Sequence, residues 1–296
     1  MNKSNGNPAR RSAAAIETCR MHPSMQSFVI SFLSAAMLVA GSNEMTIGAF
    51  NIQIFGDAKS KKADVLEVLA DIVTNFDVIA VQEIRDSSGE AMPRLMERVH
   101  TRDTRYRYVI SDRLGRSVSK EQYAFVYRTN IVQCSGASVY RDTNDVYERP
   151  PYIGHFAAGI FTFTLIIVHT KPTDAEREID GLIRVIAGTT RHATNKDIIV
   201  LGDLNADGTY FSEKTTTGIR DERFCWSITD DMDTTIAESE RTYDRIIFLK
   251  KYTVEDWSGK AGVFRFDIIY RLAMPAKEVS DHFPVWARFF TDKDTD

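Results

Sequence analysis

The chain has 296 residues, of which 43% are hydrophobic, and a formal net charge of −4. This length and composition allow a large buried core and exclude a disordered or fibrous protein. The excess of acidic residues excludes binding to nucleic acid through overall positive charge, so any such contact would need a local arginine patch and a divalent metal. Three cysteines without a C-x-x-C motif or a Cys/His cluster give no indication of a structural zinc site.

Residues 1–44 differ from the rest and are predicted to be a leader. Three arginines and a single acidic residue precede an apolar run over residues 28–40. That run is short for a transmembrane span and ends in small residues, which is typical of a signal peptide. We therefore expect a secreted or periplasmic protein. A noncleaved anchor, or a buried strand or helix at the start of the domain, remains as an alternative.

The remaining chain alternates between strand-like and helix-like patterns. Residues 61–76 carry apolar side chains on one helical face, and residues 77–81 form a nearly all-apolar run typical of a buried strand. Further helices are predicted over residues 90–100 and 173–192. Strands are predicted over residues 46–50, 106–111, 123–128, 131–140, 153–169 (as a hairpin), 197–201, 243–249, 264–269 and 284–290.

This series of elements predicts an α/β protein. Periodicity alone gives no more than a mixed α/β class, but many strands with few long helices favour two sheets packed face to face with helices outside. No repeat or linker-like segment interrupts the pattern. We therefore predict one domain over residues 45–292.

Short polar signatures stand at the ends of several hydrophobic runs. They are Phe50-Asn51, Gln82-Glu83-Ile84-Arg85-Asp86, His169, Gly202-Asp203-Leu204-Asn205, Tyr243-Asp244-Arg245 and Ser280-Asp281-His282. Each alone is more often an ordinary turn. Together, in this order, they resemble the deoxyribonuclease I family of the endonuclease/exonuclease/phosphatase superfamily. The resemblance implies a four-layer α/β/β/α sandwich with two packed mixed β-sheets.

The resemblance also implies a metal-dependent phosphodiesterase. Carboxylate and amide oxygens are the ligands that Mg²⁺ and Ca²⁺ prefer. By resemblance, Glu83, Asn51 and Asp281 form the metal group together with Asp203. The implied ion is Mg²⁺ or Mn²⁺, with Ca²⁺ as an additional ion. Asp203 and Asn205 would contact the scissile phosphate and the attacking water, and they share one face if their strand continues.

Two of the six histidines fall within the signatures. A histidine can give or accept a proton near neutral pH, and a carboxylate behind it fixes its tautomer. By resemblance, Glu121 orients His169 and Asp244 orients His282. One pair would act as the general base on water and the other as the general acid to the leaving oxygen, in an order that the sequence leaves open.

The resemblance to deoxyribonuclease I extends beyond these signatures and implies DNA as the substrate. Arg85 would enter the minor groove, and Arg149 would contact the phosphate backbone. Asn205 and Tyr243 complete the implied substrate contacts. We expect a monomer that cleaves DNA with little sequence specificity and makes no stable association with membranes.

Three departures from the family pattern concern DNA and calcium more than catalysis. Ser119 stands where the family has a tyrosine that stacks on DNA, and Gly208 and Arg241 stand at the two positions of a structural disulfide. The calcium-binding loop is only partly retained, in Asp233, Thr235 and Ser239.

Two other functions remain as alternatives. One is a sphingomyelinase or another phosphodiesterase of the same superfamily, although the sequence shows no aromatic hairpin suited to membrane insertion. The other is a catalytically silent protein that binds a partner, for which the histidine and carboxylate set has no use.

Overall fold

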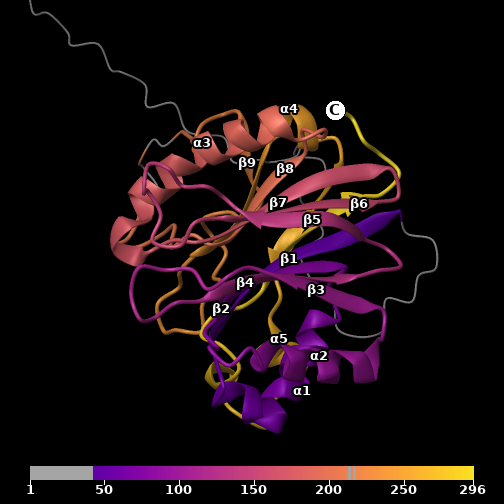
Figure 1. The fold of residues 1–296 in the computed structure, drawn as a ribbon, viewed down its shortest axis with the longest axis vertical. Coiled ribbons are helices and arrows are strands. Elements are labelled where there is room, and N and C mark those ends of the chain that lie inside the picture. The colour runs from indigo at the N-terminus through magenta and orange to yellow at the C-terminus, as the bar shows by residue number, and fades with distance from the viewer. Residues whose placement is uncertain (1–42, 213–214, 216–217) are drawn as a thin grey trace, which may run out of the picture.

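A computed structural model describes residues 43–212, 215 and 218–296 (Figure 1). All but the last two residues of the predicted leader lie outside these residues, and Glu44 is already the first residue of strand β1. Among the described helices, none combines the length and the apolar character needed to cross a bilayer.

Twelve strands form two six-stranded sheets. The first sheet has the order β11-β12-β1-β2-β4-β3 and the second the order β5-β6-β7-β8-β10-β9. In each sheet one central pair, β1 with β2 or β7 with β8, is parallel and the other pairs are antiparallel. The first sheet comprises β1 (Glu44–Phe55), β2 (Val78–Ile84), β3 (Tyr106–Ile110), β4 (Gln122–Arg128), β11 (Trp257–Val263) and β12 (Val285–Phe290). The second comprises β5 (Gln133–Val139), β6 (Tyr152–Ala158), β7 (Phe161–His169), β8 (Ile198–Asp203), β9 (Phe224–Trp226) and β10 (Asp244–Leu249).

Helices cover the two outer faces. In Figure 1, α1 (Ala63–Val73), α2 (Ala91–Arg102) and α5 (Phe266–Ile269) lie below the first sheet. The long helix α3 (Ala175–His192) and the short α4 (Lys250–Thr253) lie above the second sheet. Single 3₁₀ turns occur at Lys59–Lys61, Pro172–Asp174 and Ala276–Glu278. This arrangement confirms the predicted four-layer α/β/β/α sandwich.

The first four residues of β2 illustrate why the central strands are mostly apolar. Val78 and Ala80 belong to the core between the two sheets, whereas Ile79 and Val81 belong to the core between the first sheet and helices α1 and α2. Alternate side chains of a strand point to opposite faces, so a strand buried on both faces needs apolar residues at every position. A third core joins β7 and β8 to α3.

One predicted strand is wrong. Residues 264–269 do not form a strand, because Phe266–Ile269 makes a single helical turn that packs the buried Phe266 ring against Phe50 and Phe283. The edge strand is instead Trp257–Val263. Its small and polar residues carry no alternating apolar signal, since an edge strand that is only partly buried does not require one. The short elements β9 and α4 were also not predicted.

Candidate active site

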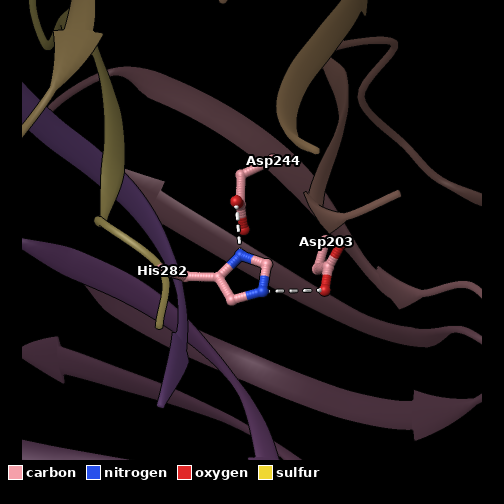
Figure 2. Close-up of side chains that lie close together, drawn as sticks. All are labelled: Asp203, Asp244 and His282. Carbon is pink, nitrogen blue, oxygen red and sulfur yellow. Dashed lines mark hydrogen bonds and ion pairs between the residues drawn. The ribbon is translucent and has the colours of Figure 1, made fainter. Parts of the chain in front are cut away.

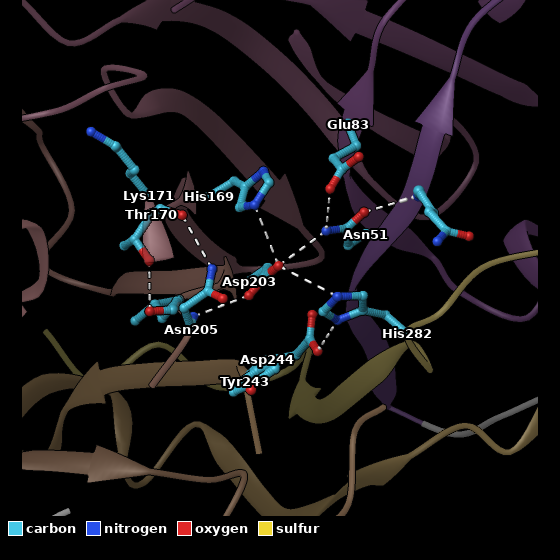
Figure 3. A network of polar contacts seen from close by, with 12 residues as sticks. Asn51, Glu83, His169, Thr170, Lys171, Asp203, Asn205, Tyr243, Asp244 and His282 are labelled. Carbon is cyan, nitrogen blue, oxygen red and sulfur yellow. Dashed lines mark hydrogen bonds and ion pairs between the residues drawn. The ribbon is translucent and has the colours of Figure 1, made fainter. Parts of the chain in front are cut away.

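Strand pairing brings the predicted site residues to the carboxyl ends of the central strands. In the second sheet, Asp203 of β8 lies opposite His169 of β7 on one side and opposite Asp244 of β10 on the other. In the first sheet, Asn51 of β1 lies opposite Gln82, one residue before Glu83. Because the sheets pack face to face, the two sets of side chains meet (Figure 3).

An irregularity in the first sheet shapes the site. The β1–β2 register shifts between Asn51 and Phe55, and Gln53, Ile54 and Glu83 have φ of 44°, 48° and 61°. Such values are costly for residues other than glycine and cluster at functional sites. The bulge lets the Ile54 N–H donate to Oε2 of Glu83 over 2.8 Å. It therefore fixes the orientation of the Glu83 carboxylate.

Asp203 is the point on which the site converges. Its Oδ2 accepts a hydrogen bond from Nδ2 of Asn51 over 3.0 Å. The same oxygen lies 3.4 Å from Nε2 of His169 and 3.6 Å from Nε2 of His282 (Figures 2 and 3). Burial opposes the charge of this carboxyl, but the two imidazoles and the Asn51 amide hold its pKa below the usual range. Asp203 is thus an anion between two histidines.

His169 forms the first histidine–carboxylate pair. Its Nδ1 lies 2.7 Å from Oε1 of the fully buried Glu121, which also lies 3.2 Å from Nε of Arg149. Burial opposes the imidazolium of His169, but the charge and hydrogen bond of Glu121 together with the charge of Asp203 raise the pKa of His169. Since a carboxylate only accepts, Nδ1 is the donor, and Nε2 is left facing Asp203.

His282 forms the second pair. Its Nδ1 lies 2.8 Å from Oδ2 of Asp244, and its backbone N–H donates to Oγ of Ser280 over 3.0 Å. Oγ of Ser280 donates in turn to the carbonyl of Asn51 over 2.6 Å, which ties this loop to β1. Burial opposes the imidazolium, but the nearby carboxylates of Asp244 and Asp203 raise the pKa of His282 well above its ordinary value.

Asn205 reaches the site in a different way from the one expected. Strand β8 ends at Asp203, and Asn205 has φ of 48°, so the two residues do not share the face of a continuing strand. The Asn205 N–H instead donates to Oδ1 of Asp203 over 3.0 Å, and its Nδ2 donates to the Thr170 carbonyl over 3.1 Å. This turn holds the Asn205 amide beside Asp203.

The carboxylates around Asn51 offer oxygen ligands for a metal ion. Nδ2 of Asn51 donates to Oε1 of Glu83 over 3.1 Å as well as to Asp203, so two carboxylates converge on one amide. Asp281, with its side chain 40% exposed, lies 3.9 Å from Nε2 of His282. Such a set of hard oxygen donors suits Mg²⁺ or Mn²⁺. In addition, Asp203, Asp244 and His282 place three possible ligand atoms within 4.8 Å of one another.

The chain matches a known family over most of its length. The model of the endonuclease/exonuclease/phosphatase family matches residues 48–282. Deoxyribonuclease gamma of Homo sapiens is 36% identical over 257 residues, which cover 81% of this chain and 84% of that protein. Deoxyribonuclease-1 of Homo sapiens is 34% identical over 273 residues, which cover 86% and 95%. The chain belongs to the deoxyribonuclease I family of this superfamily.

As a member of the deoxyribonuclease I family, the protein is a phosphoester hydrolase. Among solved structures, a D. rerio TDP2 humanized by 14 mutations has a TM-score of 0.61 at 14% identity and covers 84% of this chain and 99% of its own. At that identity the likeness shows the fold alone.

The two arginines that are predicted to contact DNA make different contacts within the protein. Arg85 lies between two carboxylates, 3.3 Å from Oε2 of Glu83 and 3.6 Å from Oε2 of Glu121. Arg149 is buried and donates to the carbonyls of His169 and Thr170. In this structure Arg149 therefore braces the loop that carries His169.

Tyr243 lies at the rim of the site. Its ring centroid is 6.4 Å from that of His282 and 5.8 Å from that of Tyr210. It directly precedes Asp244, the first residue of β10, so the ring lies next in sequence to the second carboxylate.

Sequence reasoning missed two residues that support the site. The Lys59 ammonium donates to the carbonyls of Ile52 and Gln53, both over 2.8 Å, and so holds the bulge in β1. Burial lowers the pKa of Lys59 to about 8, against the charges of Asp281 and Glu83. The hydroxyl of the buried Tyr123 accepts the His169 N–H over 3.0 Å. Neither residue stands in a recognisable pattern, since both act only through the folded backbone.

Proposed function

We propose that this protein is a divalent-metal-dependent endonuclease that hydrolyses DNA phosphodiester bonds with little sequence specificity. The observation that carries the proposal is the convergence of two histidine–carboxylate pairs on one oxygen of Asp203. Phosphodiester hydrolysis needs one group to take a proton from water and another to give one to the leaving oxygen. The names of the relatives, two deoxyribonucleases of similar length, support DNA as the substrate.

Glu83, Asn51 and Asp281 would hold the metal ion, which is Mg²⁺ or Mn²⁺ in this proposal, with Ca²⁺ as an additional ion. When bound, such an ion would neutralise negative charge on the phosphoryl oxygens. The Ile54 N–H and the Arg85 guanidinium orient the Glu83 carboxylate. The chain's own contribution is thus a carboxylate held in one orientation before any ligand arrives.

The two histidine pairs would handle the protons. Glu121 and Asp244 each keep Nδ1 of their histidine protonated, so Nε2 of His169 and Nε2 of His282 are the atoms that exchange protons. One Nε2 takes the proton of water and the other protonates the leaving oxygen. Asp203 and the Asn205 amide orient the water and the phosphate between them.

DNA would be held by a few local groups, because the chain as a whole is acidic. Arg85 would reach the minor groove, and Arg149, Asn205 and Tyr243 would lie toward the phosphate backbone. Contacts to the phosphate backbone and the minor groove distinguish few base pairs from one another, which agrees with cleavage at many sequences. Since the contacts are ionic, binding should weaken as salt rises.

The test is a comparison of phosphoester substrates with matched variants. Purified protein is incubated with supercoiled plasmid or with sphingomyelin in Mg²⁺ plus Ca²⁺, with EDTA and His169→Ala controls. His155→Ala is the matched histidine control, because His155 lies in β6 and bonds to Thr164 instead of to the site. Plasmid nicking that requires both metal and His169, but not His155, is expected. Lipid turnover with intact plasmid would assign the protein to another branch of the superfamily.

We also propose that residues 45–292 act as one monomeric catalytic domain, exported under the direction of residues 1–44 and without stable membrane association. The proposal rests on the sequence pattern of that leader. Mass spectrometry of the exported protein should find a new N-terminus near Gly41, and light scattering should give the mass of one chain. An intact leader on the exported protein would contradict the first part, and a dimer mass would contradict the second.

A further inference from the structure

A second group of acidic side chains lies at the opposite end of β8 from Asp203. Asp197 directly precedes β8, whereas Asp294 and Asp296 follow β12. One carboxylate oxygen of each lies within 4.8 Å of the others. Because a strand rises by roughly 3.3 Å per residue, Asp197 is on the order of 20 Å from Asp203. The group is therefore separate from the candidate active site.

Asp256 extends this group, and the four residues Asp197, Asp256, Asp294 and Asp296 are called the tail cluster below. Asp256 precedes β11 and is fully buried. Its charge raises the pKa of Asp197, and the charges of Asp294 and Asp296 raise that of Asp256, although burial contributes more in both cases. Burial and the neighbouring carboxylates thus both oppose ionisation of Asp197 and Asp256, and Oδ2 of Asp256 accepts the Thr295 hydroxyl of the C-terminal segment over 2.9 Å.

Several oxygens of the tail cluster are buried without a hydrogen-bond partner. Asp197 is fully buried, and no hydrogen bond of ordinary geometry reaches either of its carboxylate oxygens, although the buried Thr253 hydroxyl lies close enough to lower its pKa against burial. Oδ1 of Asp256 and Oδ1 of Asp294 are in the same condition. Buried polar atoms in proteins are almost always satisfied by a donor, a water or an ion. Four such oxygens from three carboxylates therefore point to a ligand that is positively charged.

Basic side chains among the described residues pair with other carboxylates. Arg220 pairs with Asp230, and Lys260 and Arg288 pair with Glu44. Two lysines adjoin the tail cluster in sequence. Lys196 directs its ammonium to the carbonyls of Thr190 and Ala193, and the ammonium of Lys293 lies 3.9 Å from the centroid of the Phe290 ring. Isolated buried carboxylates are costly unless they are paired or coordinate a metal.

We propose that the tail cluster is a binding site for a hard divalent cation, Ca²⁺ in particular. Carboxylate oxygens are the ligands of choice for hard cations. Ca²⁺ accepts six to eight oxygens in irregular geometry, whereas Mg²⁺ demands a near-ideal octahedron and keeps several waters. The tail cluster offers the closely spaced carboxylates of the buried Asp197, the half-buried Asp294 and the exposed Asp296, with that of Asp256 nearby. Such a set matches Ca²⁺ better than Mg²⁺.

The position of the tail cluster gives the cation a structural role. Residues after β12 cross from the first sheet to the second, where Oδ2 of Asp294 accepts the N–H of Thr162 over 3.1 Å and Asp296 accepts the N–H of Lys196. Oγ1 of Thr295 donates to the Tyr252 carbonyl in α4, beside which the C-terminal end lies in Figure 1. A bound cation would fasten this crossing segment to both sheets.

The test uses the full chain, freed of metal with EDTA and titrated with CaCl₂ alone. Isothermal titration counts the bound ions, and thermal unfolding is followed in parallel. Asp294→Asn keeps an acceptor for Thr162 but removes one ligand charge, whereas Asp292→Asn removes a charge from the same segment outside the cluster. We expect Asp294→Asn to bind one ion fewer, or to bind it on the order of tenfold more weakly, because calcium affinity follows ligand charge. Equal titrations of wild type, Asp294→Asn and Asp292→Asn would overturn the proposal.

Asp197→Asn separates a ligand from a merely structural residue. At a calcium concentration about a hundred times Kd, a site present only in the folded state should raise the melting temperature by about 5 to 10 °C. Asp197→Asn should lose that rise and yet melt no lower than wild type in EDTA, because it removes buried repulsion. A lower melting temperature in EDTA with an unchanged rise in Ca²⁺ would overturn the site.

Discussion

Replacing Glu121 with Gln isolates what the buried charge contributes to the first histidine pair. Oε1 of Glu121 contacts both Nδ1 of His169, at 2.7 Å, and Nε of Arg149, at 3.2 Å. An amide oxygen at the same place keeps both contacts and turns the amide nitrogen toward Arg85. Glu121→Gln therefore keeps the geometry of the pair and removes its charge.

The magnitude follows from the distance. Two unit charges about 4 Å apart interact by about 4 kcal/mol at an effective dielectric of 20. Losing an interaction of this order lowers the pKa of His169 and withdraws the partner of its imidazolium. A general acid or base contributes on the order of 10²–10⁴-fold to the rate, so kcat should fall by about 10²–10³-fold. Glu121→Ala should in addition lower the free energy of unfolding by about 3–5 kcal/mol, because it leaves buried arginine charge unpaired.

The assay is the initial rate of plasmid nicking at saturating Mg²⁺, with urea unfolding of the same samples. Glu67→Gln is the matched control, since Glu67 also pairs with two arginines, Arg98 and Arg102, but on the outer helix layer. We expect the control to retain the wild-type rate. A Glu121→Gln rate equal to that of the control would refute the assigned role of the charge.

Two further predictions concern stability. Asp86 accepts the N–H groups of Ala91 and Ser88 ahead of α2, and these bonds, against burial, lower its pKa to about 2. Asp86→Ala should cost about 1–2 kcal/mol at neutral pH. Because the folded-state pKa of Asp86 is depressed, this contribution to stability is present above about pH 4 and disappears as the pH falls toward 2. Urea titrations at several pH values should therefore show a difference in unfolding free energy between wild type and Asp86→Ala that shrinks as the pH falls. A difference independent of pH would contradict this prediction. Gly154→Ala would place a Cβ 2.6 Å from Phe156 and 2.8 Å from Phe125, so we expect a loss of about 1–3 kcal/mol. Gly136→Ala in β5 has no atom within 4 Å of its Cβ and should be nearly neutral; equal melting temperatures for the two alanine variants would contradict the packing argument.

The fold was largely predictable because its central strands are buried on both faces. A run such as residues 78–81, apolar at every position, indicates a central strand between two cores. Trp257–Val263 is an edge strand that pairs with β12 alone, and its sequence carries no continuous apolar run. The strand predicted over residues 264–269 includes Phe266–Ile269, where the chain makes a helical turn.

The candidate site was predictable where a polar residue follows a hydrophobic run. His169 and Asp203 end neighbouring parallel strands, so their proximity follows from the sheet register. Glu121 lies before β4 without any periodic signal, and only the family resemblance singled it out. The positive φ of Glu83 and the bracing by Lys59 depend on backbone strain and on contacts that form only after folding.

The convergence of both histidines on Asp203 is most directly tested by Asp203→Asn in the plasmid-nicking assay. Asparagine has nearly the same shape and keeps one oxygen, so we expect an unchanged melting temperature. Without the anion between His169 and His282, nicking in Mg²⁺ should fall to the level of the His169→Ala variant. A folded Asp203→Asn protein that nicks plasmid at the wild-type rate would contradict the account.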